Sequence, residues 1–337
     1  DKTIPLVSIN NLIENQILNV SNIPFNAQGT ANDLTSQVQK IFVSIDNETT
    51  FSLANFDGLN WNYTLPALES NDYNVSIKAE DYADNNSVLA RLEITIDINQ
   101  PIINSFMIDN NNSYSADEIV ALNLDIIDAT EVRFSCNNVD WNAFENYSTS
   151  IDFNLMNSSI GCNPSNGNSI TVYVNAKDSS GNDTNANDSI SYDSRIPTDL
   201  TLSINENAIY TNNQLVDLNL STNDGYTEFI SFSCNAIDWS NWQAYSTSIA
   251  DFNLANNLIG CSTSDWNAQL YFSAKSKAGL ISDTNGFDSI IIDLTKPDAF
   301  TLNDLNYYNK VNSINLQWTS AVDPIVNSVN SGIKEYN

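Results

Sequence analysis

The sequence predicts an all-β chain, made of tandem antiparallel β-sandwiches in an elongated array. Short segments alternate apolar and polar residues with period two, and clusters of Asn, Asp, Gly and Ser separate them. No long segment has the 3.6-residue period of a helix. About seven short strands in each stretch of about 100 residues are typical of two packed antiparallel sheets.

A short motif, Asp-x-x-x-Pro, divides the chain into units. It occurs at residues 1–5, 97–101, 193–197 and 293–297, so its prolines are 96, 96 and 100 residues apart. Such a period matches one sandwich domain and is too long for a solenoid repeat. We therefore expect complete domains at 1–98, 99–194 and 195–294, and a partial fourth domain at 295–337.

Alternation predicts where the strands lie in each unit. In the first unit the expected strands are 39–45, 73–79 and 89–96. In the second they are 119–126, 132–136, 170–176 and 188–192, and in the third 215–220, 229–234, 270–274 and 288–292. In the partial unit, 313–318 and 331–336 have strand patterns. That unit alone could not bury its apolar face, so either its own chain or another chain completes it.

The charge balance excludes several classes of partner. The net charge is −29, with only 12 Lys plus Arg. Such a chain repels nucleic acid and anionic lipid, whereas dissolved cations suit it. The sequence has no apolar run of about 18 residues, so we expect no membrane span in this segment.

Composition also argues against enzymatic chemistry. Histidine is absent, which removes the commonest general base and metal ligand. Only 10 glycines occur, and none forms a phosphate-binding loop. Carboxylates are plentiful, but nothing singles out a pair fixed across a cleft. We expect no enzyme.

Four cysteines fall into two pairs at corresponding positions of units two and three, Cys136 with Cys162 and Cys234 with Cys261. No Cys-x-x-Cys spacing exists, which argues against zinc. The sequence predicts two disulfides, each worth about 3 kcal/mol by loop closure. Disulfides place the protein outside a reducing cytosol.

Units two and three are related copies. Residues 134–141 (FSCNNVDW) match 232–239 (FSCNAIDW), and 147–151 (YSTSI) match 245–249 (YSTSI). With the Asp-x-x-x-Pro junctions and the hairpin segment 175–182 (NAKDSSGN), this pattern resembles the tandem immunoglobulin-like domains of prokaryotic surface proteins. These are bacterial adhesins and archaeal surface-layer and filament proteins. The partial unit resembles the start of a fibronectin type III-like sandwich.

The resemblance places the last hairpin of a domain at the end where the chain enters. Asp1 should then lie near Asp81, Asp84 and Asn85, and Asp97 near Asp178, Asn182 and Asp183. Clustered carboxylates repel unless a cation joins them, so calcium is the expected cofactor. The alternative is that Asp caps a turn and its carboxylate is solvated. Ser276 and Lys277 replace Asp178 and Ser179 in the third unit, so Asp193 should lack a calcium site.

Tryptophans and Asn sequons provide two further candidate sites. Trp141 and Trp239 occupy equivalent positions, which favours packing, whereas Trp242 and Trp266 have no counterparts and are candidates for sugar stacking. Asn-x-Ser/Thr sequons are as frequent as chance predicts in so Asn-rich a chain. They permit N-glycosylation in a secreted setting, for example at Asn62, Asn74, Asn146 and Asn219.

We therefore expect a structural segment of an extracellular, self-assembling cell-surface protein, either a surface-layer or a filament subunit. Its partners would be copies of itself, other surface proteins or glycans. One alternative is the rigid stalk of an adhesin, and another is an array of carbohydrate-binding modules. An assembling subunit should present apolar patches to other chains, whereas a stalk should be solvated throughout.

Overall fold

The structure, a computed structural model, describes residues 2–222, 224–303 and 316–335. Strands make up almost all of its regular structure, and the helices are single 3-10 turns. In these ranges no helix is long and apolar enough to span a bilayer. The strands form six sheets, and each predicted complete domain contains one five-stranded and one smaller sheet. We call the three pairs of sheets the first, second and third sandwich.

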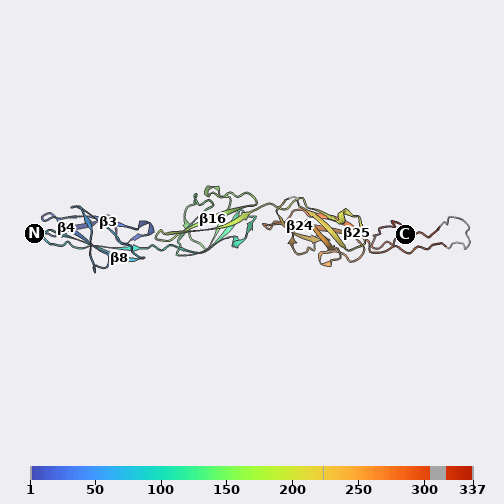
Figure 1. Cartoon of the computed structure of the whole chain (residues 1–337), viewed down its shortest axis with the longest axis horizontal. Coiled ribbons are helices and arrows are strands. Elements are labelled where there is room, and N and C mark those ends of the chain that lie inside the picture. The colour runs from blue at the N-terminus through green and yellow to red at the C-terminus, as the bar shows by residue number, and fades with distance from the viewer. Residues whose placement is uncertain (1, 223, 304–315, 336–337) are drawn as a thin grey trace. The chain divides into compact units, whose positions relative to one another are not determined.

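The first sandwich has sheet orders β1-β3-β7-β6 and β2-β9-β8-β4-β5. Figure 1 labels β3, β4 and β8. The bounds are β1 (Leu6–Ile9), β2 (Gln16–Leu18), η1 (Val20–Asn22), β3 (Asn26–Asn32), β4 (Val38–Ser44), β5 (Ser52–Leu53), β6 (Asn55–Phe56), β7 (Asn60–Thr64), β8 (Asn71–Asp81) and β9 (Ala90–Ile96). Trp61 lies in the core and donates its indole N–H to the carbonyl of Ser8 at 3.0 Å. Gly29 leaves room for this ring and for its acceptor, because a Cβ there would lie 2.5 Å from Trp61 Nε1 and 1.9 Å from the Ser8 oxygen.

The second sandwich has sheet orders β10-β12-β15 and β11-β17-β16-β13-β14. Its elements are β10 (Ile102–Ile108), η2 (Asp109–Asn111), β11 (Tyr114–Ser115), β12 (Ile119–Ile127), β13 (Glu131–Ser135), β14 (Glu145–Asn146), β15 (Ser150–Asn154), η3 (Ser158–Ile160), β16 (Asn168–Lys177) and β17 (Asp183–Tyr192). Ring contacts join its two sheets. The Phe134 centroid lies 6.4 Å from that of Phe106 and 5.7 Å from that of Phe153.

The third sandwich repeats this plan with orders β18-β20-β23 and β19-β25-β24-β21-β22. Its elements are β18 (Thr201–Ile204), η4 (Asn205–Asn207), β19 (Tyr210–Thr211), β20 (Leu215–Ser221), β21 (Thr227–Ser233), β22 (Gln243–Ala244), β23 (Ser248–Asn253), η5 (Asn257–Ile259), β24 (Trp266–Ser276) and β25 (Gly286–Ile292). Figure 1 labels β24 and β25, and β16 of the second sandwich. One apolar cluster fills its core and includes Leu218, Phe232 and Phe272.

The predicted all-β class of antiparallel sandwiches is confirmed, and among the described strands each five-stranded sheet adds one parallel pair. In each five-stranded sheet a short strand runs parallel to the last strand: β2 with β9, β11 with β17 and β19 with β25. In the first sandwich β1 pairs with β3 in one sheet and β2 joins the other. The start of the domain is thus divided between its two sheets. No hairpin joins the first and last strands, so nothing forces an antiparallel pairing.

Contacts divide the chain into two compact units. One comprises residues 1–112, 119–163 and 170–190, and the other 113–118, 164–169 and 191–337. The division falls within the second pair of sheets, whereas the predicted domain boundaries at 98, 194 and 294 follow the sheets. Those boundaries stay predictions.

Part of the predicted fourth domain lies outside the described residues, namely 313–315 and 336–337. In the described part, Leu302 bridges Trp318, and Asp298 donates its N–H to Val322 O at 2.7 Å. The expected strand at 331–336 does not form over 331–335. Residues of one chain therefore pair with each other here.

Both predicted disulfides are present. Cys136 is bonded to Cys162 and Cys234 to Cys261, with Cα atoms 5.0 Å apart in each pair. Each bridge ties the end of a central strand, β13 or β21, to the chain after a 3-10 turn. The Cys136 N–H also donates to Ile160 O at 2.8 Å, and Cys234 N–H to Ile259 O at 2.7 Å.

Candidate functional site

The β16–β17 hairpin turns around one carboxylate. Asp178 accepts the backbone N–H of Ser180 at 2.8 Å and of Asn182 at 2.9 Å. The Asn182 side-chain amide donates to the second Asp178 oxygen at 3.0 Å. The carboxylate satisfies donors that the tight turn leaves unpaired, which explains why Asp is suited to this position.

The same turn holds the first junction, residues 97–101. Asn182 is fully buried, and its Nδ2 donates to Asp97 O at 3.0 Å. Its Oδ1 accepts the backbone N–H of Val20 at 3.0 Å. Ser180 Oγ donates to the Asp97 carboxylate at 2.6 Å, and Asn19 Nδ2 donates to Ser180 O at 2.8 Å. One hairpin of the second sandwich is thus bonded to the linker and to η1 of the first.

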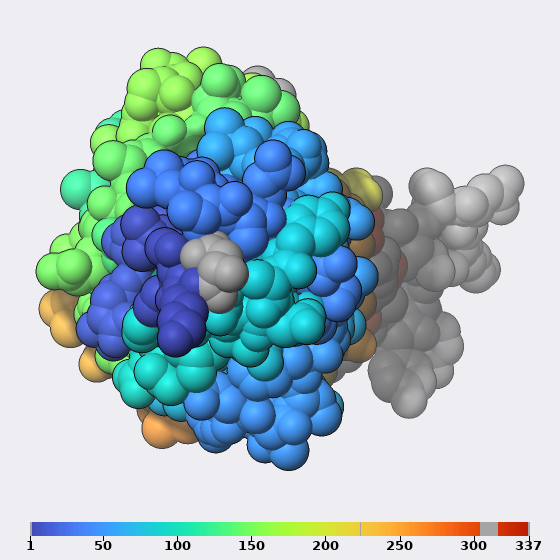
Figure 2. All heavy atoms as spheres, turned by 90° about the vertical axis from the view of Figure 1, so that its left-hand side faces the viewer, coloured from blue at the N-terminus to red at the C-terminus, as the bar shows by residue number. Residues whose placement is uncertain are grey.

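The first sandwich has the equivalent turn between β8 and β9. Asp81 accepts hydrogen bonds from Asn85, Ala83 and Ser36. Burial raises the pKa of Asp81, but these hydrogen bonds, led by Asn85, outweigh it and lower the pKa to about 2. Figure 2 views this part of the chain, where dark-blue atoms from its start lie among lighter blue and cyan atoms of the first sandwich. Asp1, the expected neighbour of Asp81, lies outside the described residues.

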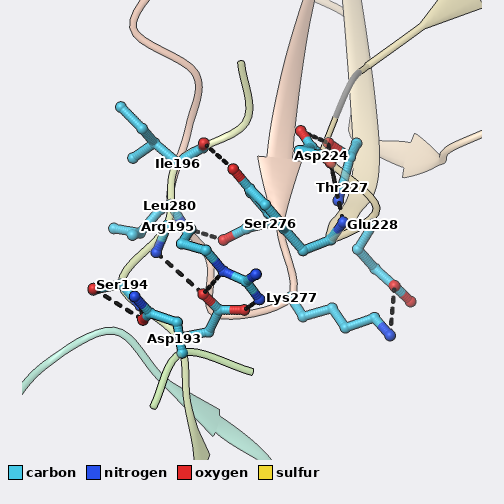
Figure 3. A network of polar contacts seen from close by, with 12 residues as sticks. Asp193, Ser194, Arg195, Ile196, Asp224, Thr227, Glu228, Ser276, Lys277 and Leu280 are labelled. Atoms are coloured by element: carbon cyan, nitrogen blue, oxygen red, sulfur yellow. Dashed lines mark hydrogen bonds and ion pairs between the residues drawn. The ribbon is translucent and has the colours of Figure 1, made fainter. Parts of the chain in front are cut away.

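The second junction, residues 193–197, uses an ion pair (Figure 3). Arg195 donates to the Asp193 carboxylate from Nε at 2.8 Å and from Nη2 at 2.6 Å. These bonds hold the pKa of Asp193 below its usual range, although burial raises it. The Arg195 guanidinium lies 4.3 Å from the Tyr226 ring centroid, and Tyr226 donates its hydroxyl to Ile196 O at 2.9 Å. An ion pair and a cation–aromatic contact therefore hold this junction, whereas amide hydrogen bonds hold the first.

The β24–β25 hairpin of the third sandwich lacks the side chains that hold the first junction. Ser276 replaces the turn carboxylate, and its hydroxyl accepts the Leu280 N–H at 3.2 Å. Lys277 reaches Glu228 at 3.9 Å (Figure 3). With neither the Asp nor the Asn of the second sandwich here, Asp193 has Arg195 as its partner. Gly167 leaves room for that arginine, since a Cβ there would lie 2.8 Å from Nη2.

The third junction, residues 293–297, is again different. Asp293 accepts the Ser331 N–H at 2.7 Å, and Asp265 accepts the Leu294 N–H at 2.8 Å. Asn327 Nδ2 donates to Asp265 O at 3.1 Å. The described part of the predicted fourth domain is therefore bonded to the end of the third sandwich.

The expected calcium ligands are brought together only in part. Asp97 does meet the hairpin of Asp178 and Asn182, but Asp183 instead accepts Asn175 Nδ2 at 2.6 Å, and Asp84 is exposed. Among the described residues, no group of three acidic, His or Cys side chains is placed to hold a metal ion. Amide donors occupy both oxygens of Asp81 and Asp178. This donor set suits a hydrogen-bonded turn and does not fit calcium as it stands. Calcium binding at the junctions, which the sequence predicts, stays a prediction.

The two candidate sugar-stacking tryptophans lie apart. Trp242 precedes β22, is 36% exposed, and has Lys275 Nζ 4.7 Å from its ring centroid. Trp266 begins β24 and packs against the core, with an enclosed Nε1 that lacks a hydrogen-bond partner in the described chain. Trp266 and Lys275 are nine positions apart on β24, about 30 Å of strand. The two rings therefore do not form one platform, and Trp266 belongs to the packing.

The sequon asparagines lie on strands. Asn74, Asn146 and Asn219 are exposed, and Asn62 is half-buried. Asn74 Nδ2 donates to Asn47 at 2.7 Å, and Asn62 Oδ1 accepts from Asn55 at 3.2 Å. Exposure permits glycan attachment at the first three, which stays a prediction.

Several junction residues were not foreseen from the sequence. Asn19, Val20, Arg195 and Tyr226 carry contacts that no repeat or motif indicated. They come from loops that differ between units, so only the folded chain shows them beside the junctions. Arg195, two residues after Asp193, was the one local sequence feature that could have predicted a partner for that carboxylate.

No protein-family model matches the chain, and neither does any curated protein. Among solved structures it is similar to fibronectin(III)-like modules of CbhA from Clostridium thermocellum, at 13% identity and a TM-score of 0.33, covering 56% of this chain and 94% of that one. It is similar to part of a bacterial ice-binding adhesin, at 12% identity and a TM-score of 0.33, covering 87% and 99%. Titin domains A168–A170 give 12% identity and a TM-score of 0.29, covering 86% and 97%. At these scores the likeness carries no functional argument.

Proposed function

We propose that this chain is a structural segment of an extracellular, self-assembling cell-surface protein, of the surface-layer or filament kind. One observation carries the self-assembly: a pair of exposed isoleucines, Ile102 and Ile127, on the smaller sheet of the second sandwich. Two disulfides support an oxidising, extracellular location. The junction hydrogen bonds support a mechanical role, because they couple consecutive sandwiches.

The apolar face lies on β10 and β12. Ile102 and Ile127 are directly opposite each other across the two strands and are 59% and 54% exposed. Ile119 on β12 is 61% exposed, and Met107 on β10 is 37% exposed. The inward residues of β12 alternate with these and fill the core, so the outward set is not a by-product of core packing. Asn123 and Asp125 lie between Ile119 and Ile127 on this outward side, so the contiguous apolar contact is the Ile102–Ile127 pair, which we take as the interaction surface.

Electron microscopy of the intact native protein on its cell surface tests the proposal. Ordered layers or filaments containing this chain are the expected result. Isolated molecules anchored separately to the surface, with no lattice or filament, would contradict self-assembly.

A second candidate is the stalk of a cell-surface adhesin. The junction contacts favour it equally, because a stalk also needs restrained linkers. The exposed isoleucines distinguish the two candidates. Substituting Ile102 and Ile127 by Ser should weaken assembly of a layer or filament subunit, whereas it should leave a stalk's behaviour unchanged.

A further inference from the structure

Three buried carboxylates gather at the third junction, and none forms an ion pair within the described chain. Asp265, Asp293 and Asp323 are 4%, 5% and 7% exposed. The five ion pairs of the described residues include none of them. Lys296, three residues after Asp293, is exposed and belongs to none of these pairs either. A buried charge is costly unless an opposite charge compensates it.

Asp323 has one oxygen for which the described chain offers no donor. Its Oδ2 accepts the backbone N–H of Ser331 at 3.0 Å and of Gly332 at 2.6 Å. Its Oδ1 is enclosed and has no hydrogen-bond partner among the described residues. Both oxygens of Asp265, by contrast, accept hydrogen bonds. An enclosed carboxylate oxygen without a donor indicates a positive partner that the described residues do not supply.

One N–H group brings the Asp323 carboxylate to a second carboxylate. The Ser331 N–H also donates to Asp293 Oδ2 at 2.7 Å, so Asp293 and Asp323 share a single donor. The other Asp293 oxygen accepts the Thr295 N–H at 3.2 Å. Two negative groups that face one hydrogen in a buried setting repel each other. A cation bound between them would replace this repulsion with attraction to both.

The second junction shows what supplies such a charge elsewhere in the chain. Asp193 occupies the motif position of Asp293, is 4% exposed, and has Arg195 bonded to both of its oxygens (Figure 3). Thr295 stands at the position of Arg195 in the third junction. Two equivalent buried carboxylates therefore differ in one respect. Within the described residues, the third junction lacks the positive charge that Arg195 gives to the second.

We propose that Asp293 and Asp323 bind a divalent cation from solution, calcium, at the third junction. Calcium accepts carboxylate, backbone carbonyl and water oxygens in a flexible geometry. The described residues provide no third acidic, His or Cys side chain for a metal here. Backbone carbonyl groups and water therefore complete the shell of about six to eight oxygens. With only two carboxylates the site should be weak, with a Kd of about 0.1–1 mM.

This site differs from the calcium sites that the sequence predicts. Those sites use the hairpin carboxylates Asp81 and Asp178, whose oxygens already accept amide donors. Ser276 replaces that carboxylate in the third sandwich, and Asp323 comes instead from the chain that follows the junction. A cation held by Asp293 and Asp323 would tie that following chain to the end of β25. The inference is independent of the proposed self-assembly.

Calorimetric titration of the full chain with CaCl₂ measures the affinity, at about 0.15 M NaCl to screen exposed carboxylates. The wild type should show saturable binding with a Kd of about 0.1–1 mM. Asp323→Asn keeps an oxygen for the two backbone donors but removes the charge, so binding should weaken at least about tenfold. The matched control is Asp283→Asn, which makes the same change in net charge at an exposed site on the β24–β25 hairpin. It should leave this affinity unchanged.

Amide hydrogen exchange of the same proteins locates the cation. Calcium should slow exchange at Ser331 and Gly332 at least about tenfold in the wild type, and should not do so in Asp323→Asn. The turn around Asp178 is the internal control, because its carboxylate also accepts two backbone N–H groups. Exchange in that turn should not respond to calcium. Each variant is compared with itself with and without calcium, which removes the effect of the substitution on stability.

Three results would overturn the site. The first is calcium binding to Asp323→Asn as tight as to the wild type, or an equal loss in Asp283→Asn. The second is saturable binding that leaves exchange at Ser331 and Gly332 unchanged. The third is a wild-type chain with no saturable binding up to about 10 mM calcium, ten times the weakest expected Kd. Layers or filaments on the native cell surface test the proposed function separately from all three.

Discussion

The fully buried side chain of Asn182 donates to the backbone carbonyl of Asp97 at 3.0 Å, joining the last hairpin of the second sandwich to the linker that precedes that sandwich. Its carbonyl oxygen accepts the Val20 N–H at 3.0 Å. One amide therefore satisfies backbone groups from two other segments, which makes the first junction part of the folded structure.

We expect Asn182→Ala to destabilise the first junction by about 2–3 kcal/mol, because it leaves buried donors and acceptors unpaired. Denaturant unfolding of the full chain measures this. Asn175→Ala is the matched control, since Asn175 is as fully buried as Asn182 and its amide donates to Asp183 within the same sandwich. Equal losses in both variants would show that the junction bonds add nothing.

Two equivalent glycines provide a sharper comparison. Gly181 and Gly279 both have positive φ, +91° and +87°, at the same turn position of the second and third sandwiches. A Cβ on Gly181 would lie 2.8 Å from Asn19 Nδ2, whereas Gly279 has nothing within 4 Å. Gly181→Ala should therefore cost about 1 kcal/mol more than Gly279→Ala, the excess reflecting the displaced Asn19. Equal unfolding midpoint shifts would contradict the contact.

The first sandwich should lose stability in acid through Asp81. Its pKa is lowered to about 2, so the folded state favours the carboxylate. That contribution is fully present above the ordinary Asp pKa near 3.9 and is lost as pH falls toward 2. Asn85→Ala removes the side-chain amide's hydrogen bond to the carboxylate and keeps the backbone one, so the pKa should rise part of the way toward 3.8 and acid unfolding should begin at higher pH. NMR titration of Asp81 checks both; an unmoved pKa would refute this account.

Each disulfide should stabilise its own sandwich. The bridges join residues 26 and 27 positions apart. Replacing Cys136 and Cys162 by Ser should cost about 3 kcal/mol by the chain-entropy argument. Reductant should lower the melting transitions of the second and third sandwiches and leave that of the first, which has no Cys, unchanged. A shift of all transitions together would point to a general effect of the reductant.

Calcium binding at the junctions is the remaining prediction from the sequence, and a calcium titration tests it. Because amide donors already occupy the oxygens of Asp81 and Asp178, we expect chelator to leave the melting temperatures of the first and second sandwiches unchanged. Stabilisation by added calcium that disappears in Asp178→Asn, but persists in Asp193→Asn, would instead establish a metal site at the first junction.

Alternation and the Asp-x-x-x-Pro period were sufficient to predict the sandwich class and most central strands. The strands expected at 170–176 and 215–220 appear as β16 and β20. Short edge strands such as β5 and β14 were missed, because two residues are too few to show a period. The parallel strand β2 was missed because it has only three residues and its partner β9 is distant in the sequence.

What the sequence determined by itself is local and repetitive: the period, the alternation that fills each core, and the cysteine pairs at matching positions. The tertiary structure decided how the junctions are held. Asp97 and Asp193 occupy the same motif, yet one contacts Ser180 and Asn182 and the other Arg195. A carboxylate takes whichever donors the fold brings within about 3 Å. Those donors come from loops far away in the chain, whose meeting depends on packing and not on local pattern.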